Sequence, residues 1–221
     1  MRTTFAIALV WLASQLGATQ AKYSLSISGQ SVGTGTLTYT KLSNGDYRLV
    51  VDLSLAIQGN SLRLQDEEVV DKSARPISSS VVQEAGGHKV ERKIAFGPKA
   101  LVRTDSVDGN APQKKTVAYP KGKSIAQPSD LWFVTNKPAV GAVSMETQYD
   151  SESGSWQNHK NVFVGPTTIT IGNKKVKANL IQDKNLADGR LVRDWRDQHG
   201  IPFRMELPIP NGILQLDRVM N

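Results

Sequence analysis

Residues 47–57 read Tyr-Arg-Leu-Val-Val-Asp-Leu-Ser-Leu-Ala-Ile, and this run is the clearest strand signal in the chain. Its odd positions are all apolar, whereas Arg48, Asp52 and Ser54 stand among the even ones. Alternation with a period of two places successive side chains on opposite faces of an extended strand. The run therefore predicts a strand with one dry face and one wet face, which is typical of antiparallel sheets.

Shorter runs with a β pattern flank this stretch on both sides. They lie at residues 23–28, 36–40, 90–96, 142–149, 156–164, 167–171, 176–180, 191–195, 203–207 and 213–219. Tight-turn pairs separate several of them, because Asn and Gly accept the positive φ that a two-residue hairpin loop requires. Such pairs are Asn44-Gly45, Gly59-Asn60, Gly86-Gly87 and Gly172-Asn173.

These patterns predict an all-β protein built on a strongly curved antiparallel sheet, or half-barrel, with at most short helical turns. One such turn is expected at Asp130–Phe133. Residues 106–130 hold few apolar side chains and several Gly and Pro, so we expect them to join two halves of one β domain, residues 22–221.

The first 21 residues resemble an export signal. Arg2 precedes an apolar run at residues 5–13, and Thr19-Gln20-Ala21 offers small residues for cleavage after Ala21. The apolar run is about half the length of about 20 residues that a membrane-spanning helix needs. We therefore expect a periplasmic or secreted protein that does not span the membrane.

The absence of cysteine excludes disulfides, thiol catalysis and a lipid anchor on a cysteine. The formal net charge of +7 falls to +6 once Arg2 is removed with the signal. Basic residues near predicted turns could contact an anionic envelope component if those turns share one rim, or they could serve solubility alone. Nucleic acid is not expected as a partner, because aromatic residues do not alternate with the basic ones.

No motif points to a specific reaction, so no catalytic residue and no cofactor is predicted. His88, His159 and His199 lack metal-ligand spacing, so no metal site is expected. Gly154-Ser155-Trp156 lacks the second glycine of a hydrolase nucleophile elbow. A hydrolase whose Asp, Glu and His residues are brought together only by the fold stays open as an alternative.

Two segments carry a resemblance to a known family. They are Pro128–Phe133 with Lys137–Gly141, and the run Trp195–Glu206. The upstream tripeptides Ala74-Arg75-Pro76 and Ala95-Phe96-Gly97 fit the same resemblance. In these segments the chain resembles a bacterial exported family, domain of unknown function 3108. The resemblance implies an extracytoplasmic curved sheet similar to the lipoprotein-carrier half-barrels, without known catalytic residues.

The leading hypothesis is a non-enzymatic exported protein that binds a hydrophobic or amphipathic molecule, such as a lipid, on the concave face of the sheet. The alternative is an envelope assembly or interaction protein that contacts an anionic partner through basic turns. Alternation does not distinguish a cavity from a filled core. The residues expected to line the concave face are Leu49, Val51, Leu53, Leu55, Ile57, Ile169, Ile171, Phe203 and Met205.

Overall fold

A computed structural model describes residues 18–57, 59–72, 75–122, 137–210 and 212–220. The expected helical turn at Asp130–Phe133 lies outside these residues. The described strands are β1 (Ala18–Ile27), β2 (Gln30–Lys41), β3 (Tyr47–Ile57), β4 (Asn60–Val70), β5 (Pro76–Ala85), β6 (His88–Phe96), β7 (Ala100–Val107), β8 (Gln113–Ala118), β9 (Val143–Asp150), β10 (Ser155–Ile171), β11 (Lys174–Asn185), β12 (Leu191–Arg196), β13 (Pro202–Ile209) and β14 (Gly212–Arg218).

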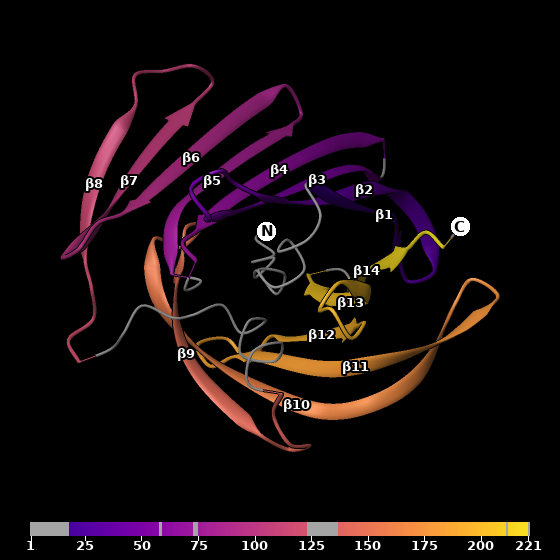
Figure 1. The fold of residues 1–221 in the computed structure, drawn as a ribbon. Helices are drawn as coiled ribbons and strands as arrows, with labels where there is room; N and C mark the ends of the chain where they lie inside the picture. The colour runs from indigo at the N-terminus through magenta and orange to yellow at the C-terminus, as the bar shows by residue number, and fades with distance from the viewer. Residues whose placement is uncertain (1–17, 58, 73–74, 123–136, 211, 221) are drawn as a thin grey trace.

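All of these strands belong to one unclosed antiparallel sheet (Figure 1). The strand order is β8-β7-β6-β5-β4-β3-β2-β1-β14-β13-β12-β11-β10-β9, so the first and last strands pair in its middle. Its free edges are β8 and β9, which follow one another in the sequence. The prediction of an all-β, strongly curved antiparallel sheet is confirmed. β8 occupies part of the stretch expected to join the two halves, and the link to β9 begins after Ala118.

The strand β3 has the bounds that its alternation predicts. Leu49, Val51 and Leu53 are each only 2 % exposed. Val51 pairs with Leu37 and Leu53 pairs with Leu64, so the same face extends over the neighbouring strands β2 and β4. We call this face the inner face. Its apolar side chains on β1–β5, β13 and β14 form one buried cluster, the apolar wall, which includes Tyr23, Leu25, Leu37, Tyr39, Leu49, Val51, Leu53, Leu55, Leu64, Val81, Met205, Leu207, Leu214 and Leu216.

The two free edges overlap without backbone pairing to each other. The registers place Tyr149 and Trp156 on the outer face of β9 and β10, yet these rings pack against Ile94 and Leu101 on the inner face of β6 and β7. Figure 1 accordingly shows the β9–β10 hairpin inside the curve of β6–β8. The sheet is therefore rolled so that its two edges overlap, an arrangement we call the scroll. Side-chain packing, and not backbone pairing, holds the two edges together.

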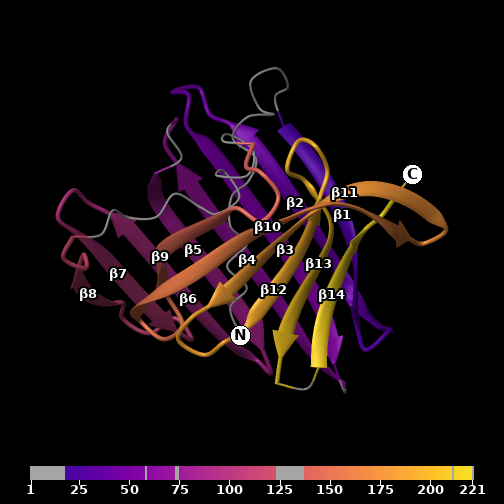
Figure 2. The same ribbon diagram turned by 90° about the horizontal axis from the view of Figure 1, so that it is seen from below.

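A β-bulge within β10 moves the side chains that follow it to the opposite face of the sheet. Phe163 pairs with Ile181, but Gly165 already pairs with Leu180, so Val164 is an extra residue. A shift of one residue moves every later side chain to the other face. Ile169 and Ile171 therefore do not share the inner face with Met205, contrary to expectation. The sequence showed two strands at 156–164 and 167–171, whereas the structure has one continuous bent strand, seen from below in Figure 2.

The strand β1 starts before the predicted cleavage point. Ala18–Ala21 pair with Leu37–Thr40 of β2, and the Ala21 side chain is buried. The described part of the chain has no helix with the length and apolar character needed to cross a membrane.

Candidate functional site

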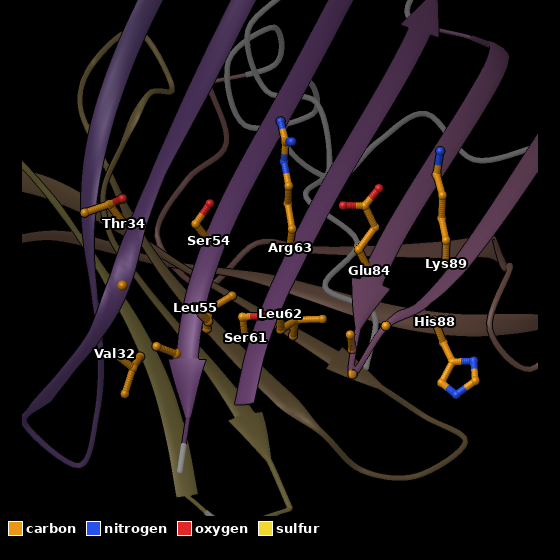
Figure 3. Close-up of a pocket in the computed structure, with 15 residues that line it drawn as sticks. Val32, Thr34, Ser54, Leu55, Ser61, Leu62, Arg63, Glu84, His88 and Lys89 are labelled. Carbon is orange, nitrogen blue, oxygen red and sulfur yellow. The ribbon is translucent and has the colours of Figure 1, made fainter. Parts of the chain in front are cut away.

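A groove of about 620 Å³ opens where β2–β6 end at three hairpin turns (Figure 3). The residues that line it come from both faces of the sheet at the strand ends. The cross-strand registers show which lining residues lie on which face. Gly33, Leu55, Leu62, Ala85 and His88 lie on the inner face, whereas Thr34, Ser54, Arg63, Glu84 and Lys89 lie on the other.

The apolar part of the groove continues the apolar wall. Leu55 belongs to the buried cluster and also lines the groove, and Val32 and Leu62 pack against the same cluster. Gly33 makes the close pairing of β2 and β3 possible here, because a Cβ atom on it would lie 1.9 Å from the Ser54 carbonyl oxygen. The apolar wall thus reaches solvent at this rim.

The charged side chains at the groove are held by neighbouring carboxylates. Arg63 donates to Asp52 at 3.1 Å, and this hydrogen bond raises the pKa of Arg63. Lys89 lies 2.7 Å from Glu91, which raises the pKa of Lys89 and lowers that of Glu91. Figure 3 shows Arg63, Glu84 and Lys89 extending in one direction, away from Val32 and Leu55. These cations are already paired, so the geometry does not select an anionic ligand.

His88 fastens the β5–β6 hairpin to the turn after β7. Its Nδ1 lies 2.9 Å from an Asp108 carboxylate oxygen, and the other oxygen accepts the Lys89 backbone N–H at 2.7 Å. The hydrogen bond to Asp108 raises the pKa of His88, and the same bond lowers the pKa of Asp108. This pair holds one side of the groove in place.

The structure brings together some of the predicted site residues. Leu49, Val51, Leu53 and Met205 lie in the buried apolar wall, and Leu55 connects that wall to the groove. Ile57 packs against the same cluster and is half-buried.

The remaining predicted site residues lie elsewhere. Ile169 and Ile171 lie on the outer face because of the β10 bulge. Phe203 occupies a bulge in β13, where its ring centroid is 4.1 Å from the Arg218 guanidinium carbon. Here too an extra residue breaks the alternation that placed Phe203 with Met205 in the sequence.

Buried charges fill the inner face near the loop between β12 and β13. Arg196 donates to Asp194, and both side chains are nearly inaccessible. Burial raises the pKa of Asp194 against the opposing effect of Arg196, and burial also raises the pKa of Tyr23. The Tyr23 hydroxyl donates to the Pro202 carbonyl at 2.9 Å. These hydrogen bonds connect β1, β12 and β13, so the cluster stabilises the fold.

The three histidines are not brought together. His88 pairs with Asp108, and His159 lies 2.9 Å from Asp183. His199 stands in the turn between β12 and β13. No group of three His, Asp or Glu side chains suited to a metal ion occurs among the described residues. Sequence spacing could not reveal the His159–Asp183 pair, because a hairpin register joins its members.

Two pairs of basic residues near turns lie far apart in the structure. Lys114 and Lys115 lie on β8, whereas Lys174 and Lys175 lie at the β10–β11 turn on the opposite side of the molecule in both ribbon views (Figures 1 and 2). These two pairs therefore do not belong to one common rim.

Comparison with solved structures supports the fold. A β-barrel-like protein of domain of unknown function DUF1849 from Brucella abortus aligns with a TM-score of 0.66 at 10 % identity, over 92 % of this chain and 96 % of that one. A DUF1089 family protein from Pseudomonas aeruginosa aligns with a TM-score of 0.42 at 8 % identity, over 94 % of this chain and 97 % of that one. The first similarity shows a β-barrel-like fold and gives no information on function.

No family model and no curated protein matches the sequence. The resemblance to domain of unknown function 3108 is therefore not confirmed.

Proposed function

We propose that this chain is a non-enzymatic binding protein that takes the apolar part of a hydrophobic or amphipathic molecule at the groove of β2–β6. The observation that carries this proposal is the continuity at Leu55, which lies in the buried apolar wall and also lines the open groove. An apolar chain that binds at Val32 and Leu62 would move out of water and pack against the exposed end of the apolar wall.

The size and chemistry of the groove support this proposal. Its volume of about 620 Å³ falls within the range of small-molecule sites, roughly 300–1,000 Å³. Paired cations and carboxylates at Arg63 and Lys89 border its apolar side chains. Such a border suits a molecule with one apolar and one polar end.

We further propose that the protein works outside the cytoplasm, as the signal-like first 21 residues suggest. Amino-terminal sequencing of the exported protein tests this: a start at Lys22 is expected, and a chain that keeps Met1 and stays in the cytoplasm would overturn it. The alternative, an anionic envelope partner, is less favoured because Lys114-Lys115 and Lys174-Lys175 lie on opposite sides of the molecule.

Titration with the apolar dye anilinonaphthalene sulfonate tests the binding proposal, together with mass spectrometry of an organic extract of the purified protein. We expect a saturable site and a co-purified apolar molecule. Leu62→Gln places an amide in the groove, and its desolvation should weaken dye binding about tenfold. Ile77→Gln, at an exposed position on β5, is the matched control and should bind as the parent does.

Two results would overturn this proposal. One is the lack of any saturable dye site together with an extract free of apolar molecules. The other is an equal dissociation constant for the parent chain, Leu62→Gln and Ile77→Gln, since a site in the groove must respond to the first substitution.

A further inference from the structure

Part of the outer face of β9–β11 presents apolar side chains to solvent. The scroll covers Tyr149 and Trp156 on this face, which pack against β6 and β7. Further along β9 on the same face, Val143 is 49 % exposed and Met145 is 61 % exposed. We call this exposed area the outer patch. Its apolar members are Val140, Val143, Met145, Val164 and Leu186.

Strand pairing places the first part of the outer patch side by side. Val143 pairs with Val162, and Met145 pairs with Lys160. These residues share a face with Tyr149, because Val143, Met145 and Tyr149 occupy alternate positions of β9. The patch therefore begins where the overlap of the two sheet edges ends.

The other apolar members border this row. The Leu186 backbone N–H donates to the Asn158 carbonyl of β10 at 2.8 Å. Val140 lies against β10, because a Cβ atom on Gly165 would lie 3.0 Å from a Val140 methyl carbon. Val164 is the extra residue of the bulge, next to Gly165. Five of the ten large apolar side chains that are exposed among the described residues thus lie on this surface.

Two lysines stand within the outer patch. Lys160 pairs with Lys184 across β10 and β11, and both side chains are exposed. Like charges directly opposite each other destabilise an antiparallel pair. Their neighbours on the same face of these strands carry no negative charge; they are Met145, Asn158, Val162 and Gln182. An external anion would therefore relieve a repulsion that the strand face itself leaves in place.

Carboxylates close to the patch in the sequence do not neutralise it. Those on β9–β11 lie on the inner face, among them Glu146 and Asp183. Asp188, two residues after Leu186, forms an ion pair with Arg190. The outer patch thus combines exposed apolar side chains with an uncompensated positive charge.

We infer that the outer patch docks on the surface of an anionic phospholipid bilayer. Lysine ammonium groups bind lipid phosphates, while apolar side chains beside them enter the headgroup region. A fluid lipid surface needs no fixed hydrogen-bond geometry, and flexible lysines among Met and Val side chains offer none. Figure 1 shows β10 and β11 on the side of the scroll opposite β1–β5, so their outer face is turned away from the rest of the sheet.

This inference goes beyond the proposed function and does not depend on it. The groove lies at the turns of β2–β6, whereas the outer patch lies on β9–β11. It also differs from a contact through basic turns, because Lys160 and Lys184 stand within strands.

A fluorescent label within the patch tests this inference. The chain has no cysteine, so Met145→Cys accepts a single thiol-reactive nitrobenzoxadiazole label. We expect its emission to rise and shift to shorter wavelength with vesicles of equal parts phosphatidylcholine and phosphatidylglycerol, and not with phosphatidylcholine alone. Val102→Cys, exposed on β7, carries the control label and should not respond. The label reports its own surroundings, so membrane contact by residues 5–13 does not by itself produce this signal.

Charge variants of the labelled Met145→Cys protein test the role of the lysines. Lys160→Gln with Lys184→Gln should weaken vesicle binding about twentyfold, since each lysine near an anionic surface contributes about fivefold. Lys114→Gln with Lys115→Gln removes the same charge from β8 and is the matched control, with binding within about twofold of the parent. The melting temperature of the first double variant should equal or exceed that of the parent, because a like-charge pair is removed.

Three results would overturn this inference. The first is a Met145→Cys label that does not respond to anionic vesicles. The second is an equal effect of the two lysine pairs on vesicle binding. The third is a label response that follows protein concentration without vesicles, which would show that a second copy covers the patch. Dye binding in the groove is measured separately, so each of the two proposals can fail alone.

Discussion

The Trp156 indole N–H donates a hydrogen bond of 2.9 Å to the backbone carbonyl of Ala118. Ala118 is the last residue of the edge strand β8, and Trp156 lies at the start of β10 on the other side of the gap. The Trp156 ring also makes edge contacts with Tyr119 and Tyr149, at centroid distances of 5.6 and 5.3 Å. One side chain thus links the two edges of the open sheet.

Truncation of this link should loosen the scroll. Trp156→Ala removes the indole hydrogen bond and both ring contacts, so we expect a loss of about 2–4 kcal/mol in the free energy of unfolding. Trp156→Phe keeps an aromatic ring and should cost only about 1 kcal/mol. Urea unfolding measures both. Hydrogen exchange should become faster in β8 and β9 but not in β3, and uniform acceleration across the sheet would contradict an edge link.

The groove should not tolerate a side chain at Gly33. A Cβ atom there would lie 1.9 Å from the Ser54 carbonyl oxygen, and a backbone atom cannot move aside without breaking the β2–β3 pairing. We expect Gly33→Ala to cost about 3 kcal/mol. Gly29→Ala is the matched control, since its φ is +81° and its Cβ would meet open space, and it should cost about 1 kcal/mol. Equal unfolding midpoints for the two variants would argue against the close contact.

The His88–Asp108 link should depend on pH. Because Asp108 raises the pKa of His88, the folded protein binds the His88 proton more tightly than the unfolded chain does. The contribution of this pair is therefore complete below the ordinary His pKa of about 6.5 and is lost as the pH rises through the folded value. An NMR titration of the His88 ring should show the raised pKa, and Asp108→Asn should bring it back toward about 6.5. An identical titration curve in both proteins would disprove the pairing.

Cleavage after Ala21 should shorten the sheet at β1. Ala18–Ala21 pair with Leu37–Thr40, so β2 would keep only β3 as its partner along those residues. We expect the amides of Leu37–Thr40 that face β1 to exchange faster in the exported protein than in the uncleaved chain. Hydrogen exchange with mass spectrometry on both forms measures this, and unchanged protection there would show that the exported chain keeps these residues.

Much of the fold could be predicted from local alternation. The run at residues 47–57 predicts β3 with the correct bounds, because a strand with one buried face needs apolar side chains at every second position. The turn pairs Asn44-Gly45 and Gly86-Gly87 also fall between paired strands. Such signals are local, so one sequence is enough to find them.

What the sequence could not predict is which face of a strand points inward. Val143, Met145 and Tyr149 alternate with Glu146 and Gln148 on β9. Sequence reasoning turns apolar side chains inward, yet here the polar ones face in. Tyr149 on the outer face is covered by β6 and β7, whereas Val143 and Met145 on that face stay exposed. A single bulge at Val164 likewise reversed Ile169 and Ile171. Both effects depend on strands far away in the sequence.

The pairing of β1 with β14 also determines when the sheet can be completed during folding. Ser24 and Asp217 are 193 residues apart, whereas Arg63 and Asp52 in adjacent strands are 11 apart. Closing the longer loop costs about 2.5 kcal/mol more in chain entropy. The meanders β1–β8 and β9–β14 can form early from hairpins between consecutive strands, and β14 must then find β1. Until then β1 presents an open edge, so the chain is most exposed to misassociation before β14 pairs with β1.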